Sequence, residues 1–281
     1  MRTPLLCPRF LRLLFLVLLA LGAPRVSHAT LPLPYCTFYG QARDEYGWPY
    51  VKDAEVVLRV QGRECSRWRI QGMLAPGVNF KLPLELDDGR SSAYATYAAL
   101  PGQTVQLSVV VQGVERPIIE RRVLTAGQPG DLIAVSATVG TDANGDGIPD
   151  EWEQLLVDYS FGLLKSIYDV HPQDDFDGDG VSNLDEFRSG TYPFLADDYL
   201  RVEETAFVGG KLRLKFLTSP GISYQILASA ECGAAAQWQP VPFATSEGAA
   251  TQQQWLVGDG FFVSVYLELP APCGFFRLVA Q

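Results

Sequence analysis

Histidine is scarce in this chain of 281 residues, which contains only 2. His171 is the one that lies beyond the leader-like N-terminus, so sites built from several histidines are excluded, and a Ser-His-Asp arrangement would depend on this residue alone. The sequence also lacks a glycine-rich phosphate loop and a nucleophile elbow. We therefore expect a protein that is not an enzyme, with no catalytic residues.

Basic residues are too few to form a nucleic-acid-binding surface. The chain has 22 Lys and Arg against 32 Asp and Glu, for a net charge of −10. The acidic excess is concentrated in residues 142–198, which carry 15 Asp and Glu but only Lys165 and Arg188. Such a segment repels polyanions and attracts cations. We expect no nucleic-acid partner.

Apolar runs of about twenty residues are missing, so we expect no membrane span. Residues 1–29 have the pattern of a signal peptide: Arg2, Arg9 and Arg12 near the start, then the apolar stretch 13–21, and small residues ending at Ala29. Cleavage there would start the mature chain at Thr30. We expect a secreted protein, released to the medium or held in the periplasm or at the cell surface.

Cysteine is also rare, with 5 in the chain. One of them, Cys7, lies in the leader, and an even number remains in a chain expected to be exported, which favours disulfides. We favour the pairs within one candidate domain, which are Cys36 with Cys65 and Cys232 with Cys273.

Two regions have the alternation of apolar and polar residues that is typical of strands. In residues 30–139 the apolar positions are Phe80, Leu82, Leu84, Leu86 and Val105, Leu107, Val109, Val111; in residues 199–281 they include Leu212, Leu214 and Phe216. Pro83 indicates a sheet edge, because proline cannot donate to a ladder. The predicted fold is mainly β, with two β-sandwich-like modules joined by a small helical calcium-binding segment at residues 140–198.

The stretch from Gly40 to Pro49, with Ala54-Glu55-Val56 after it, resembles the opening of carboxypeptidase-regulatory-like and Cna-B-like modules. That resemblance implies a transthyretin-like sandwich at residues 30–139, of the kind used as a spacer or an adhesive stalk.

Two stretches of twelve residues match an EF-hand-type calcium loop, with oxygen ligands at positions 1, 3, 5, 9 and 12, a carbonyl at position 7 and glycine at position 6. The first loop offers Asp142, Asn144, Asp146, Ile148, Asp150 and Glu153, and the second offers Asp175, Asp177, Asp179, Val181, Asn183 and Glu186. Four carboxylates held this close repel one another unless a cation neutralises them. The sequence predicts two calcium ions.

In both loops the apolar residue, Ile148 or Val181, stands at position 7, and Pro149 at position 8 of the first loop has no N–H for a β-bridge between loops. The pattern is similar to bacterial thrombospondin type 3-like repeats and, more distantly, to dockerin. That resemblance covers residues 140–195 and implies loops that end in a helix without needing one before them.

Helical spacing follows the first loop, at Trp152, Leu155, Leu156 and Tyr159, and continues in residues 163–168, where we expect a second helix that covers the first. Asp150 stands where a helix cap is expected. After the second loop, Gly190 and Pro193 should end a short helix.

Two functions remain open. The preferred one is a structural or interaction protein in which two calcium-loaded loops rigidify the connection between β-modules, with an extracellular protein or glycan as its unidentified partner. The alternative is a carbohydrate-binding or dockerin-like partner-docking module. Tyr46, Trp48 and Tyr50 alternate around a turn and could stack on a sugar, although such aromatics more often pack on a sandwich core.

Overall fold

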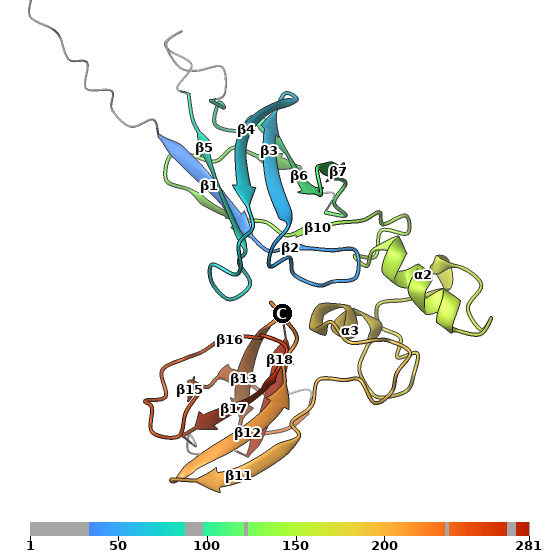
Figure 1. The fold of residues 1–281 in the computed structure, drawn as a ribbon, viewed down its shortest axis with the longest axis vertical. Helices are drawn as coiled ribbons and strands as arrows, with labels where there is room; N and C mark the ends of the chain where they lie inside the picture. Colours follow the sequence, from blue (N-terminus) through green and yellow to red (C-terminus); the bar gives the residue numbers. More distant parts are fainter. Residues whose placement is uncertain (1–33, 88–97, 121–122, 234–235, 269–273, 281) are drawn as a thin grey trace, which may run out of the picture. The chain divides into compact units, whose positions relative to one another are not determined.

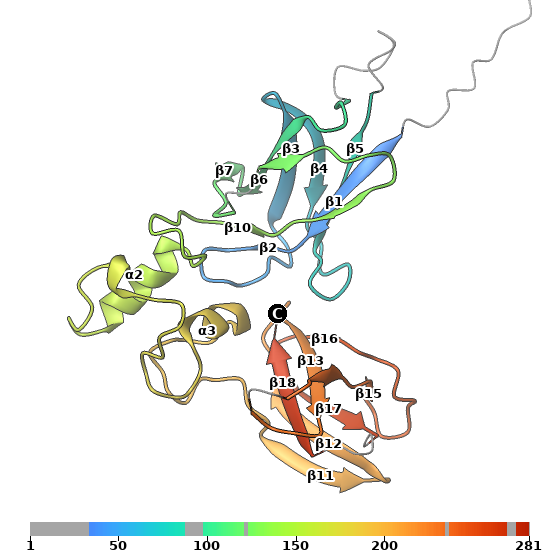
Figure 2. The same cartoon turned by 180° about the vertical axis from the view of Figure 1, so that it is seen from behind.

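The computed structural model describes residues 34–87, 98–120, 123–233, 236–268 and 274–280. The expected leader, residues 1–29, and Cys273 lie outside the described residues. The fold is mainly β with several sheets, as predicted (Figures 1 and 2).

The N-terminal strands, blue to green in Figure 1, form two main sheets and a short pair. One sheet has the order β5-β1-β9; the other has the order β4-β3-β6-β7, with β8 also paired to β6; β2 pairs with β10. Their bounds are β1 Tyr35–Gly40, β2 Ala42–Arg43, β3 Ala54–Val60, β4 Arg63–Arg69, β5 Phe80–Glu85, β6 Thr104–Val111, β7 Val114–Arg116, β8 Leu124–Thr125, β9 Leu132–Ala134 and β10 Ala137–Thr138.

The two main sheets share one hydrophobic core. Phe38 and Leu82 enter it from the first sheet and Leu58 and Val109 from the second, each fully buried. Alternate residues of a strand face opposite sides, which explains why β5 alternates buried and exposed. Pro83 is exposed, and β5 is the end strand of its sheet, as predicted.

The expected disulfide between Cys36 and Cys65 is not formed in the structure, where both are free thiols. Cys36 is fully buried on β1, whereas Cys65 lies on β4 in the other sheet. The register of β3 and β4 pairs Leu58 with Ser66 but Arg59 with Glu64, so Cys65 is the extra residue of a β-bulge. Its thiol donates to the carbonyl of Arg63 (3.4 Å). Cys232 is a free, exposed thiol.

The C-terminal strands, orange to red in Figure 1, form two further sheets around a separate hydrophobic core. The orders are β11-β12-β17-β15 and β14-β13-β16, and β18 also pairs with β13. Their bounds are β11 Glu204–Val208, β12 Lys211–Leu217, β13 Ser223–Ser229, β14 Gln239–Pro240, β15 Phe243–Ala244, β16 Leu256–Val257, β17 Phe262–Leu267 and β18 Phe275–Ala280.

The segment between the two groups of strands holds α2 (Asp150–Tyr159), the 3-10 turn η1 (Ile167–Asp169) and α3 (Asn183–Ser189). The expected helix over residues 163–168 is wrong. The chain turns sharply after α2, because Phe161 and Gly162 have φ angles of 52° and 82°, and the Ser160 hydroxyl accepts from Leu164 N–H (3.1 Å). Gly190 ends α3 with φ 71°, as predicted.

None of the helices among the described residues is long and apolar enough to cross a membrane.

Candidate metal centre

The two predicted loops have nearly the same backbone. Gly145 and Gly147 have φ angles of 77° and 94°, and Gly178 and Gly180 have 79° and 93°. These positions need the left-handed conformation that glycine adopts without steric cost. Each loop therefore turns in the same way at positions 4 and 6.

The first aspartate of each loop holds both glycine turns. Asp142 accepts from the N–H groups of Gly145 (2.6 Å) and Gly147 (3.3 Å). Asp175 accepts in the same way from Gly178 (2.9 Å) and Gly180 (2.8 Å). In each loop, the carboxylate at position 1 thus holds the backbone of positions 4 and 6 close to itself.

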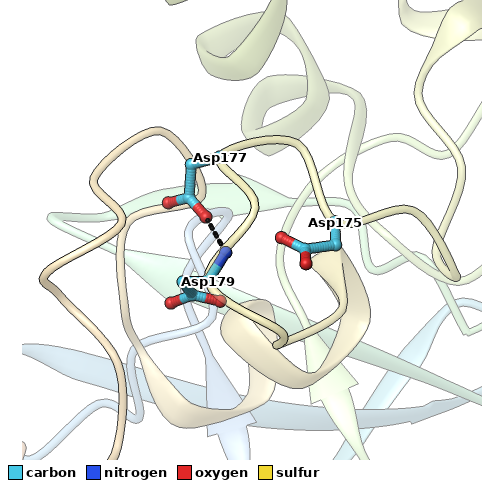
Figure 3. Close-up of side chains that lie close together, drawn as sticks. All are labelled: Asp175, Asp177 and Asp179. Carbon is cyan, nitrogen blue, oxygen red and sulfur yellow. Dashed lines mark hydrogen bonds between the residues drawn. The ribbon is translucent and has the colours of Figure 1, made fainter.

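Positions 3 and 5 continue this pattern in the second loop. Asp177 accepts from Asp179 N–H (3.3 Å), the bond drawn as a dashed line in Figure 3, and Asp179 accepts from Val181 N–H (2.7 Å). In each case one carboxylate oxygen accepts a backbone hydrogen bond, and the other oxygen is free to coordinate a metal ion.

The second loop gathers acidic oxygens that could hold a metal ion. One ligand oxygen from each of Asp175, Asp177 and Asp179 lies within 4.8 Å of the other two (Figure 3). Five side-chain oxygens of this loop are buried and have no partner among the described residues: Asp177 Oδ2, Asp179 Oδ2, Asn183 Oδ1, and Glu186 Oε1 and Oε2. Buried acceptors without donors are costly, and a cation would satisfy them.

The electrostatics of Glu186, the last predicted ligand of the second loop, also favour a bound cation. Burial, together with the charges of Asp177 and Asp179, raises the pKa of Glu186 to about 8. The pKa of Asp177 is also raised, by burial and by Asp179. Proximity of like charges in a low dielectric disfavours ionisation, and a bound cation would reverse this.

The first loop brings its predicted ligands together with a different set of bonds. Asn144 accepts from Asp146 N–H (3.3 Å), and Asp146 accepts from Ile148 N–H (3.0 Å). However, Asn144 Nδ2 donates to Asp146 Oδ2 (3.1 Å) and to Glu153 Oε1 (2.8 Å). Glu153 is fully buried, and burial raises its pKa to about 8.

Both carboxylate oxygens of Asp150, at position 9 of the first loop, already accept hydrogen bonds within the protein. Asp150 accepts from Thr141 Oγ1 (2.8 Å) and from Ala143 N–H (2.7 Å). Asp150 is the first residue of α2, and the N-cap residue is Pro149, so the expected capping role of Asp150 is wrong. Thr141 was missed by the sequence reasoning, although a hydroxyl directly before the first aspartate was a visible signal.

The helices after the two loops share a small hydrophobic core. Its buried members are Ile148, Trp152, Leu156, Val170 and Phe187. Ile148, at position 7 of the first loop, is fully buried there, while the Val181 side chain at the same position of the second loop is half-buried. This core fixes one loop relative to the other.

The other residues considered from the sequence do not gather into a site. Only Tyr46 of the three alternating aromatics is exposed; Tyr50 packs on the N-terminal core, and an added Cβ on Gly190 would lie 3.5 Å from the Trp48 ring. His171 is exposed, and its carbonyl accepts from Asn183 Nδ2 (2.8 Å).

No protein-family model matches the chain, and neither a curated protein nor a solved structure matches it.

Proposed function

We propose that this chain is an exported calcium-binding protein that binds two ions, one in each loop, and that acts as a structural or interaction protein rather than an enzyme. The observation that carries the proposal is the set of five buried, unpartnered oxygens in the second loop. They come from positions 3, 5, 9 and 12, which are ligand positions of EF-hand-type loops. The leader-like pattern of residues 1–29 supports export.

Oxygen-only ligation favours calcium over softer metals, which take nitrogen and sulfur ligands. Glu186 leaves both carboxylate oxygens free and buried, which suits the bidentate ligand of calcium's large, irregular shell. Magnesium requires a smaller octahedral shell and keeps several waters. We therefore propose calcium as the resident ion.

The ions would rigidify the connection between the β-modules. The helices after the loops share a core, and α3 contacts the N-terminal strands, because Arg43 Nη1 donates to the Arg188 carbonyl (3.3 Å). A loop fixed by calcium fixes α3, and α3 then holds its contacts in one geometry. The partner that would use this arrangement is an extracellular protein or glycan.

Calorimetric titration of the full chain with calcium chloride tests the proposal. We expect two sites per chain, with Glu186→Gln abolishing one and Glu153→Gln abolishing the other. Asp158→Asn is the matched control, because Asp158 is an exposed carboxylate of α2 that is not a predicted ligand. The absence of binding heat in the unaltered chain would contradict the proposal.

A further inference from the structure

We infer that the two calcium sites are unequal: the second loop binds first and more tightly, and the first loop binds only after Asn144 and Asp150 give up hydrogen bonds made within the protein. This inference rests on the proposed function and concerns the order and strength of binding at the same loops. It is carried by differences between corresponding side chains in two loops whose backbones match.

The second loop is ready for an ion as it stands. Asp177, Asp179, Asn183 and Glu186 each present at least one buried oxygen without a donor. Asn183 is held by a bond from its Nδ2 to the His171 carbonyl (2.8 Å), which turns the amide nitrogen away and leaves Oδ1 free. Calcium therefore replaces no hydrogen bond on these oxygens.

Position 3 differs between the loops. Asn144 occupies in the first loop the place of Asp177 in the second, and its Nδ2 donates to two other predicted ligands, Asp146 and Glu153. An amide nitrogen cannot be a ligand for calcium, so the amide must rotate until Oδ1 faces the ion. That rotation breaks both bonds and the bond that Oδ1 accepts from Asp146 N–H.

Position 9 differs as well. Asp150 accepts from Thr141 Oγ1 and from Ala143 N–H, one bond on each oxygen. Asn183, at the same position in the second loop, keeps its Oδ1 free. To serve as a ligand, Asp150 must lose or share a bond that the second loop never makes.

These differences make the first site weaker, because ligand rearrangement lowers the apparent affinity by the fraction of molecules in the competent state. Total ligand charge does not separate the two loops, because each supplies four carboxylates and one amide. Calcium affinity also depends on site rigidity, and the hydrogen bonds of Asn144 and Asp150 distinguish the loops in that respect. We expect the two dissociation constants to differ by roughly tenfold or more, about 1.4 kcal/mol.

Site-resolved titration of the unaltered chain gives the first test. Gly147 and Gly180 donate their N–H groups to the position-1 aspartates of the two loops, so their amide signals in nitrogen-15 NMR report each site separately. Calcium should shift the Gly180 signal in the first equivalent and the Gly147 signal in the second. Simultaneous shifts, or Gly147 first, would overturn the inference.

Substitutions give the second test. Asn144→Asp removes the Nδ2 donor and gives position 3 the same residue as in the second loop, although it also adds a fifth carboxylate; it should strengthen the weaker step about tenfold or more. Thr141→Val removes the hydroxyl from Asp150 without changing any charge, and should also strengthen that step. Thr141→Ser, which keeps the hydroxyl, is its control and should leave the step unchanged.

The outcomes separate this inference from the proposed function. No calcium binding at either glycine signal would defeat both. Two equal steps, or a weaker step that neither Asn144→Asp nor Thr141→Val strengthens, would defeat the inference alone. The strand signal in circular dichroism, expected to be the same in every variant, checks that each one is folded.

Discussion

The rings of Trp152 and Phe187 meet edge to face, with centroids 6.1 Å apart and planes at 81°. Trp152 lies in the helix after the first loop, and Phe187 lies in the helix after the second. Edge-to-face pairs are a favourable arrangement of aromatic rings and contribute about 0.5–1.5 kcal/mol beyond the burial of their surface. This contact joins the helices that follow the two loops into one small core.

Removal of the Phe187 ring should destabilise the segment that contains the two loops and the helices α2 and α3. Phe187 is 5% exposed, and truncation of a buried phenylalanine typically costs about 3–5 kcal/mol. Phe187→Ala should lower the free energy of unfolding of the segment and weaken calcium binding at both loops, measured by chemical unfolding and by calorimetry. Phe161→Ala is the control, because Phe161 is 97% exposed and should change neither. Equal effects of the two variants would contradict a shared core.

Calcium-free stability should fall as the pH rises. The pKa of Glu186 in the folded protein is about 8, raised from 4.5 by burial and neighbouring aspartates. Between these values the folded state binds more protons than the unfolded state, so stability is full below about pH 4.5 and is lost as the pH rises through about 8. Thermal unfolding in chelator across this range measures the effect.

Glu186→Gln should flatten this pH dependence in part, and Glu153, whose pKa is also about 8, accounts for a further part. Calcium affinity should change in the opposite direction and increase up to about pH 8, because the ion displaces the protons. Calcium affinity that does not vary with pH would contradict protonated ligands in the calcium-free protein.

Much of the site could be predicted from sequence, because loop ligands and glycine turns follow one another along the chain. The spacing at Gly147 and Gly180 correctly implied a sharp turn in both loops. The bonds of Asp150 and Asn144 could not be predicted, because their direction depends on which neighbour competes for each oxygen.

The fold, like the site, could be predicted from the sequence only in part. Alternation placed Leu82 and Val109 inward correctly, since successive side chains of a strand take opposite faces and the apolar ones take the face toward the core. The helix expected at residues 163–168 failed because the apolar spacing there carried no sign of the left-handed turn at Phe161. The pairing of Cys36 with Cys65 failed because a β-bulge and the assignment of strands to sheets are tertiary features.

Gly47 should tolerate no side chain. Its φ is 88°, and an added Cβ would lie 2.3 Å from the Phe187 carbonyl oxygen. Gly62→Ala is a matched control, because Gly62 has φ 76° but nothing within 4 Å. The control should cost about 1–2 kcal/mol from the left-handed backbone, and Gly47→Ala should cost clearly more. Equal losses in chemical unfolding would show that the contact with α3 does not contribute.

Calcium should protect the loop segment from amide hydrogen exchange while leaving the β-cores nearly unchanged. A ligand stabilises only the state that binds it, by about 2.7 kcal/mol at a hundredfold excess over Kd, which slows exchange through local opening roughly 100-fold. The N-terminal and C-terminal cores contain no residue of either loop, so their strands gain nothing directly.

Exchange measured by mass spectrometry, in calcium and then in chelator, should therefore slow in peptides from residues 142–186 and hardly change in β3 and β13. Magnesium at the same concentration is the control and should protect less, because it keeps its waters and requires an octahedral shell. Protection that extends equally through β3 and β13 would mean that calcium is required for the fold of the whole chain. In that case the effect of the ions would not be limited to rigidifying the connection between the β-modules.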